Sequence, residues 1–304
     1  MASTSVLLIG GVAIPPAGVV LVPLALQPVL TFGCRFGIGW GISVLLAASL
    51  LLLALAGKEL ALVYGVLALM AVLLFALLGR LRSVEFLVSG IAGVVFTFAC
   101  GVLLYFYGSW PALVQDLHRS LNENLMAALR IHEKIGFPQD SLDLLRERIP
   151  QVVETTLQFL PGLLFVGLAL TVLVNIVLLC RRFPGRRAEW LSIDNFREWK
   201  TPEPMVWGLI ACGFVLFIPG LQFLRIFAFN ILLVIGAAYF IQGLAIIAYF
   251  FHKNHVPRFL RGITYLLIAF EQIFTLLVVG LGLFDLWGDF RRLGKNNLNP
   301  SQAS

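Results

Sequence analysis

The stretch TTLQFLPGLLFVGLALTVLVNIVLLC, from Thr155 to Cys180, contains 26 consecutive residues without a charged side chain. A helix rises about 1.5 Å per residue, so this run is longer than the roughly 20 apolar residues that span the hydrocarbon core of a bilayer. Strands of a membrane barrel would instead show stretches of about ten residues that alternate in polarity. The run therefore predicts a membrane-spanning α-helix.

The composition of the chain extends this prediction to the whole protein. Of the 304 residues, 60% are hydrophobic and only 12% are charged, whereas soluble domains average about 25% charged residues. A water-soluble fold of this size could not bury so much apolar surface. In lipid, every backbone polar group must be paired internally, which restricts spanning structures to helices and closed barrels. The run lengths favour helices.

Eight apolar runs predict an all-α, polytopic transmembrane helical bundle of about eight spans, forming a single membrane domain over residues 1–304. The expected spans are Val6–Phe32, Gly37–Ala56, Leu60–Leu78, Phe86–Tyr107, Thr155–Cys180, Met205–Leu221, Ile226–Phe250 and Gly262–Leu283. The first span is expected to be kinked or broken, because each of its four prolines removes a backbone donor. Such a break indicates either a transporter-like site or a kink that serves packing. The prolines are Pro15, Pro16, Pro23 and Pro28.

Residues 113–150 do not form a membrane span, because they carry six acidic and five basic residues. Their leucines recur at every fourth position from Leu113 to Leu125, which is the pattern of an amphipathic helix. Gly136 to Pro138 would end this helix, and a second short amphipathic helix would follow. We expect the pair to form an extramembrane cap.

The loop 181–203 carries six basic residues and is the densest basic segment of the chain. The positive-inside rule places it in the cytoplasm. Alternation across eight spans then places both termini, the polar tail 292–304 and the cap on the opposite side. The expected partners are the lipid bilayer and other membrane subunits.

The sequence shows no sign of nucleic-acid binding, metal binding or catalysis. The net charge of +6 comes from short loops between spans rather than from a basic domain. The four cysteines are far apart and lack ligand spacing. The chain has no phosphate-binding loop, zinc pair or nucleophile elbow of the common kinds. We therefore expect no enzyme activity, no cofactor and no metal.

Polar residues inside the apolar runs are the candidates for a membrane site. Glu271 is the only acidic residue within an expected span, and a buried carboxylate indicates either a functional group or a structural one that is paired. Amides in lipid commonly hydrogen-bond across helices as packing contacts. The candidate polar membrane site consists of Glu271, Gln242, Asn230, Tyr239, Gln272 and Asn175.

A second candidate is a charge cluster where the last span ends. Asp285 and Asp289 are four residues apart, so on a helix both carboxylates lie on one face and could hold a cation or pair with a basic residue. Arg291 follows directly. The alternative interpretation is that charged residues and Trp287 gather at the membrane interface without further function.

Four stretches of the C-terminal half carry a family resemblance, namely Asn230–Leu233, Tyr239–Ala245, Arg258–Tyr265 and Gly282–Arg291. In these stretches the chain resembles the YybS-like family of predicted bacterial membrane proteins, a family of unknown function. The kinked first run is also similar to the substrate-binding subunits of energy-coupling-factor vitamin transporters. The first resemblance implies a multi-pass protein of the bacterial inner (cytoplasmic) membrane with no assigned activity. The second implies, by analogy of fold, a transporter-like or solute-binding membrane component whose small-molecule solute is unknown. The alternative is a structural or scaffold membrane protein.

Overall fold

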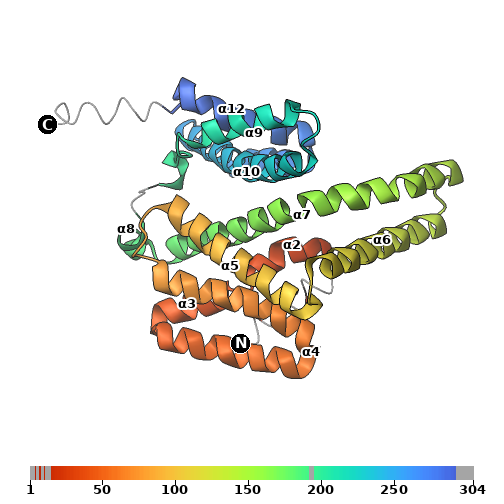
Figure 1. Ribbon diagram of the computed structural model, residues 1–304. Helices are drawn as coiled ribbons and strands as arrows, with labels where there is room; N and C mark the ends of the chain where they lie inside the picture. The colour runs from red at the N-terminus through yellow and green to blue at the C-terminus, as the bar shows by residue number, and fades with distance from the viewer. Residues whose placement is uncertain (1–3, 5–6, 8–9, 11–14, 192–194, 292–304) are drawn as a thin grey trace.

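The computed structural model describes residues 15–191 and 195–291, together with residues 4, 7 and 10. Over these residues the chain forms α-helices and two short 3₁₀ helices, and no strand occurs among them. Figure 1 shows the N-terminal helices in one layer, α7 crossing the centre, and α9, α10 and α12 in a second layer. The all-α fold that the sequence predicted is confirmed.

The proline-rich first run breaks into α2 (Pro15–Leu24) and α3 (Gln27–Phe36), as its prolines predicted. The next helix, α4 (Ile38–Leu77), turns back on itself at Gly57 (Figure 1), where a φ of +85° requires the freedom of glycine. The Phe75 ring lies against both Gly33 and Gly41. The two arms of α4 and α3 therefore pack closely together.

A hydrophobic core joins these helices to α5 (Val84–Tyr107) and to the C-terminal part of α7 (Gln139–Arg182). Its largest fully buried side chains are Leu26, Leu30, Leu52, Tyr64, Met70, Leu74, Leu87, Ile91, Ile176 and Leu179. This core fixes the N-terminal layer against α7.

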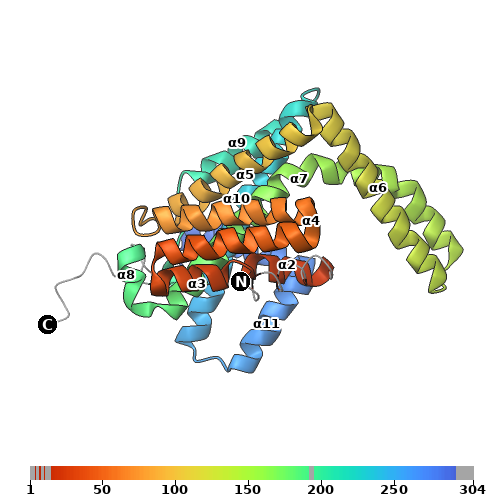
Figure 2. The same cartoon turned by 90° about the horizontal axis from the view of Figure 1, so that it is seen from below.

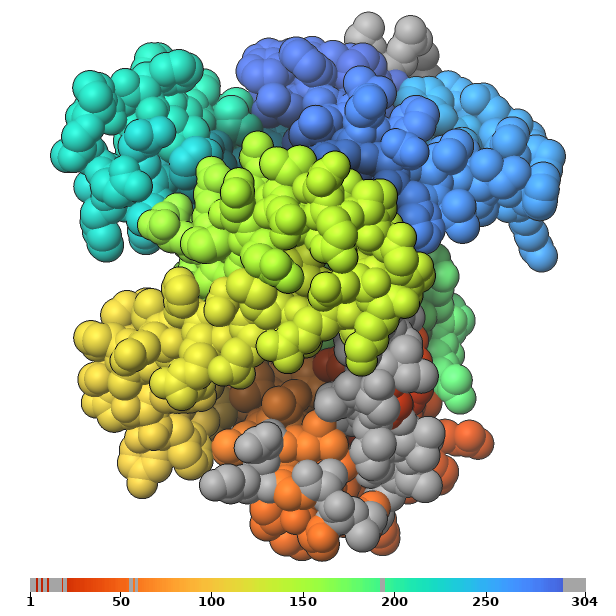
Figure 3. Space-filling view, turned by 90° about the vertical axis from the view of Figure 1, so that its right-hand side faces the viewer, coloured from red at the N-terminus to blue at the C-terminus, as the bar shows by residue number. Residues whose placement is uncertain are grey.

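Helices α6 (Trp110–Lys134) and α7 form a hairpin that projects from the bundle (Figures 1 and 2). Viewed from its tip in Figure 3, the hairpin crosses the middle of the molecule between the two layers. A small apolar cluster holds it together, consisting of Leu129, Leu142, Ile149 and Val153. The second cap helix is not separate, because α7 continues without interruption through Pro150 and Pro161 to Arg182.

The basic loop after α7 contains η1 (Pro184–Arg186), α8 (Arg187–Trp190) and η2 (Phe196–Glu198). The second layer follows with α9 (Met205–Phe217), α10 (Gln222–Lys253), α11 (Arg258–Phe270) and α12 (Gln272–Gly288). Helices α10 and α12 meet at Gly243 and Gly282, where any side chain would collide with the backbone of the other helix.

The count of eight spans is not confirmed. Four helical segments are long and apolar enough to cross a membrane, or five if the bent pair of α11 and α12 is one span, within the described part of the chain. The four are Leu60–Leu77, Val84–Tyr107, Gln139–Arg182 and Gln222–Lys253. Of the other four expected spans, three correspond to short apolar helices of 10 to 17 residues. The last one corresponds to α11 and α12, which are bent by 103° relative to each other.

The predicted tail, residues 292–304, lies outside the described residues, but the end of the last expected span does not lie where the sequence predicted. The Arg291 Nη1 atom donates hydrogen bonds to the carbonyl oxygens of Arg197 and Trp199, at 2.7 and 3.0 Å. The end of α12 therefore lies beside the basic loop and not on the opposite side. The reason is the bend, because the last apolar run does not cross in one straight segment but turns between α11 and α12.

Candidate functional site

The six polar residues of the predicted membrane site do not converge on one place. Asn175, which is fully buried, lies beside the break between α2 and α3. Its Nδ2 atom donates to the carbonyl oxygens of Pro23, at 2.9 Å, and Thr171, at 2.8 Å, while its Oδ1 atom accepts from Gln27 at 2.9 Å. The Pro23 carbonyl lies where the helix breaks, so Asn175 satisfies a backbone group that the break leaves without a helical partner.

Asn230 joins α10 to α7 at a different point. Its Oδ1 atom accepts a hydrogen bond from the Gly162 backbone N–H at 2.6 Å, and its Nδ2 atom donates to the Gln158 carbonyl at 2.8 Å. The Phe159 and Phe229 rings also meet there, edge to face, with centroids 5.5 Å apart. We call these contacts the α7–α10 junction. It holds the two helices together near the N-terminal end of α10.

Glu271, Gln272 and Tyr239 lie apart from both groups. Glu271 is not inside a continuous helix but at the break between α11 and α12, and its side chain is exposed, as is that of Gln272. Tyr239 is fully buried, and its hydroxyl has no hydrogen-bond partner among the described residues. Glu271 lines neither of the two best-formed cavities among the described residues, and its proposed functional role stays a prediction.

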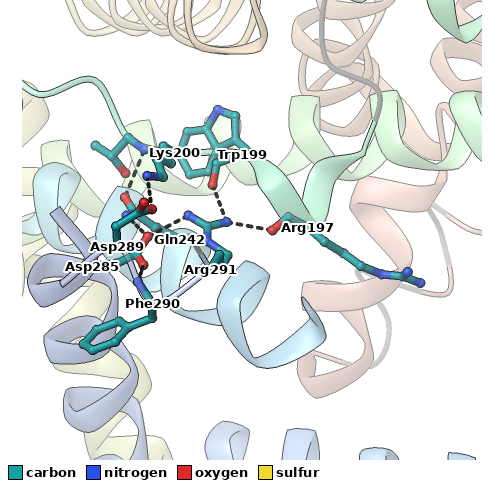
Figure 4. Close-up of polar contacts among 9 residues, drawn as sticks. Arg197, Trp199, Lys200, Gln242, Asp285, Asp289, Phe290 and Arg291 are labelled. Carbon is teal, nitrogen blue, oxygen red and sulfur yellow. Dashed lines mark hydrogen bonds and ion pairs between the residues drawn. The ribbon is translucent and has the colours of Figure 1, made fainter. Parts of the chain in front are cut away.

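Gln242 and two residues of the predicted charge cluster, Asp285 and Arg291, form one buried network, which Figure 4 shows. The Asp285 Oδ2 atom accepts from Arg291 Nη2 at 2.7 Å and from Gln242 Nε2 at 3.1 Å, and its Oδ1 atom accepts from the Phe290 N–H at 3.0 Å. Asp285 is 0% exposed and Arg291 is 2% exposed. This burial distinguishes the pair from the interfacial charges that the sequence suggested.

The network holds the end of the basic loop against α10 and α12. Arg291 contacts the carbonyl oxygens of Arg197 and Trp199, and Gln242 Oε1 accepts from the Thr201 N–H at 2.9 Å. Lys200 and Asp289 add an ion pair of 2.7 Å at the surface. All polar atoms of Asp285 and Gln242 are thus occupied by protein groups, which makes this network a structural clamp rather than an open ion site.

A cavity of about 990 Å³ lies between α5, α7 and α10. Small-molecule sites typically enclose about 300–1,000 Å³, so this cavity is at the large end of that range. Its walls are mostly apolar. Small alanines from two helices contribute to them, namely Ala169 on α7 and Ala237, Ala238, Ala245 and Ala248 on α10.

The cavity is elongated along the helices. Its lining on α7 extends from Phe165 to Arg181, a rise of about 24 Å at 1.5 Å per residue. On α10 it extends from Val234 to Ala248, a rise of about 21 Å. The lining starts just after the α7–α10 junction on both helices, so the junction closes this end and the helices separate beyond it.

The opposite end of the cavity is polar and is formed by the basic loop. Arg181, Arg187 and Arg197 line it, together with Asn195 and Trp199. Glu85 is the acidic residue among the lining side chains. Its Oε1 atom accepts from the Trp199 indole N–H at 2.6 Å, and its Oε2 atom accepts from the Ser83 hydroxyl. Both oxygens are therefore engaged by neutral donors.

Sequence reasoning missed this cavity. Glu85 directly precedes the expected fourth span, and arginines in a short loop between spans indicate topology rather than a binding site. One signal was present, because small residues recur on α10 at helical spacing, at Ala238, Ala245 and Ala248. Small residues usually allow helices to approach closely. Here they leave a space instead, because α7 and α10 diverge.

Residues 2–286 match a protein family described as "Predicted membrane protein (DUF2232)". The chain belongs to this family. The match covers nearly the whole chain and agrees with a membrane protein that has several apolar helices. No curated protein matches the chain, and no solved structure matches it. None of these comparisons supports the likeness to subunits of energy-coupling-factor transporters.

Proposed function

We propose that this protein is a transporter-like, solute-binding membrane component, and that the cavity between α5, α7 and α10 is its binding site. The observation that carries the proposal is the cavity itself, an apolar space of about 990 Å³ within a helical membrane protein. Protein interiors are otherwise close-packed. The apolar part of a solute in this space would gain packing contacts with the walls.

The shape and chemistry of the cavity favour an amphiphilic solute. Apolar walls run for more than 20 Å along α7 and α10, whereas polar groups gather at the end near the basic loop. Small-molecule sites combine mostly apolar walls with a few polar groups that fix orientation. A solute with a hydrocarbon portion and a polar end fits this arrangement.

The alternative function is a structural or scaffold protein. The amides inside the helices favour it, because Asn175, Asn230 and Gln242 all hydrogen-bond to neighbouring protein groups and do not face the cavity together. A scaffold needs no solute. The two functions therefore differ in whether the cavity has an occupant.

Native mass spectrometry of the protein, purified in mild detergent, tests the proposal. We expect the wild-type protein to retain an amphiphilic molecule, and Ala169→Trp or Ala238→Trp to retain less of it, because an indole at either position would narrow the space between α7 and α10. Ala211→Trp, on the exposed face of α9, is the matched control and should retain it. A wild-type protein without any retained molecule, or equal retention in all variants, would support the scaffold function instead.

A further inference from the structure

The polar end of the cavity combines three guanidinium groups with one carboxylate that is already engaged. Arg181, Arg187 and Arg197 line this end, and the Glu85 carboxylate accepts hydrogen bonds from Trp199 and Ser83. The formal charge of these four side chains is +2. A charge of this size at the end of an apolar cavity favours a ligand with an anionic end.

Arg187 gives an independent sign that this end of the cavity suits a ligand with hydrogen-bond acceptors. Its Nε and Nη2 atoms are buried and have no hydrogen-bond partner among the described residues. The guanidinium lies over the Phe196 ring, 5.1 Å from the ring centroid. This contact fixes the plane of the guanidinium but gives none of its N–H groups a hydrogen-bond acceptor. Buried N–H groups of this kind are nearly always paired in folded proteins. An anion at the cavity end would supply the acceptor.

The type of anion follows from the donors. Guanidinium groups bind phosphate with paired N–H donors in a fork geometry. A phosphate monoester carries about −1.5 to −2 charges near pH 7 and three strong acceptor oxygens, so it would balance the charge of +2 and engage more than one arginine. A carboxylate would balance only one of the two positive charges. Asn195 and Tyr265, which also line the cavity, add neutral donors.

We infer that the cavity binds a lipid with a phosphate headgroup, with the phosphate at Arg181, Arg187 and Arg197 and the hydrocarbon chain between α7 and α10. The inference rests on the proposed function of the cavity and names its ligand class. The lining of more than 20 Å along both helices matches an extended chain better than a compact solute. The α7–α10 junction, formed by Asn230 and Gly162, closes the space where the hydrocarbon chain would end.

Lipid titration followed by native mass spectrometry tests this inference on the delipidated full-length protein. The probes are phosphatidic acid, diacylglycerol with the same chains, phosphatidylcholine and inorganic phosphate. We expect phosphatidic acid to bind at least about tenfold more tightly than diacylglycerol, because a charge-assisted hydrogen bond is worth about one order of magnitude in affinity. Phosphatidylcholine should be weaker than phosphatidic acid, since its headgroup has no net charge. Inorganic phosphate alone should bind weakly.

Variants locate the site. The triple variant Arg181→Gln, Arg187→Gln, Arg197→Gln should remove the preference for phosphatidic acid. The matched control Arg119→Gln, Arg130→Gln, on the exposed part of α6, should keep it. If the triple variant does not fold, Arg187→Lys replaces it, because lysine keeps the charge but loses the fork and should lower the affinity severalfold.

The outcomes separate the two proposals. Equal binding of phosphatidic acid and diacylglycerol, both lost in Ala238→Trp, would overturn the phosphate assignment and leave the solute-binding function in place. Inorganic phosphate that binds as tightly as phosphatidic acid would overturn the role of the lipid's hydrocarbon chain. A preference unchanged in the triple variant or in Arg187→Lys would overturn the assignment of the arginines. A protein that binds none of the lipids would contradict the lipid inference, whereas the solute-binding function is decided by the molecule that the wild-type protein retains.

Discussion

Arg291 donates three hydrogen bonds from a fully buried position, to Asp285 and to two backbone carbonyls of the basic loop. A buried ion pair adds little net stability when it forms, because both ions lose their hydration. It becomes costly when one partner is removed, because the other charge then stays buried alone. The pair therefore fixes the arrangement of the loop more than it stabilises the fold.

The first prediction concerns this pair. Asp285→Asn should lower the free energy of unfolding by about 3–5 kcal/mol, since it leaves the Arg291 charge uncompensated. Lys200→Met removes the surface ion pair with Asp289, in which the two side chains are 39% and 34% exposed. This change should lower the free energy of unfolding by about 0–1 kcal/mol. Thermal unfolding of both variants in the same detergent measures the difference.

The double variant Asp285→Asn, Arg291→Met completes the test. It removes both charges, so it should be more stable than Asp285→Asn alone. Equal unfolding temperatures for Asp285→Asn and Lys200→Met would show that the buried pair carries no special cost. In that case the clamp would not fix the loop.

At the scale of helices, two contacts define the second layer and the cavity beside it. Helices α10 and α12 cross where Gly243 faces Val278 and Gly282 faces the Tyr239 carbonyl. Helices α7 and α10 meet at Gly162 and Asn230 and then diverge. The close contact places Asp285 beside Gln242, and the divergence leaves the space of the cavity.

The second prediction tests the crossing of α10 and α12. Gly282→Ala should destabilise the protein by about 1–3 kcal/mol, because the added methyl group would force the two backbones apart. Gly280→Ala is the matched control on the same helix, and a methyl group there would meet nothing within 4 Å. Gly280→Ala should be neutral or slightly stabilising, since alanine favours a helix over glycine. Detergent-extracted thermal stability compares the two, and equal losses would contradict the crossing.

The sequence predicted the helices better than it predicted how they meet. Run length and prolines determined the helical class and the break between Leu24 and Gln27, because both depend on local backbone chemistry. The partners of Asn175, Asn230 and Gln242 depend on which helices are neighbours. Apolar periodicity does not encode this, because all faces of a membrane helix are apolar. The cavity was hidden for the same reason.

Glu271 shows how the bend changed one interpretation. Hydropathy alone made residues 262–283 a single span with a carboxylate at its centre. The chain instead leaves the helical conformation at Glu271, with φ −103° and ψ 115°. A charged side chain costs less free energy at such a break than in the middle of a continuous membrane helix. Average hydropathy over a window of about 19 residues cannot resolve this.

At the scale of the molecule, basic residues gather on one face. Arg82 donates to the Ala188 carbonyl, Arg186 donates to the Cys34 carbonyl, and Arg291 reaches the carbonyls of the basic loop. Arg291 belongs to this face, although the count of eight spans had placed it on the other side. With Arg291 on this face, the two faces of the molecule differ more in positive charge, and this difference sets the orientation of a protein in the membrane.

The third prediction is that this face is cytoplasmic and that the α6–α7 hairpin lies on the opposite side. Short loops rich in Lys and Arg resist translocation, and the hairpin begins at the far end of α5 from the basic loop. In a variant whose four cysteines are replaced by serine, Ala188→Cys should resist an impermeant thiol reagent in intact cells. Ser120→Cys, exposed on α6, should react. Both positions should react once the membrane is opened, which controls for accessibility. The reverse pattern in intact cells would invert the orientation and would place the arginine end of the cavity in the outer leaflet.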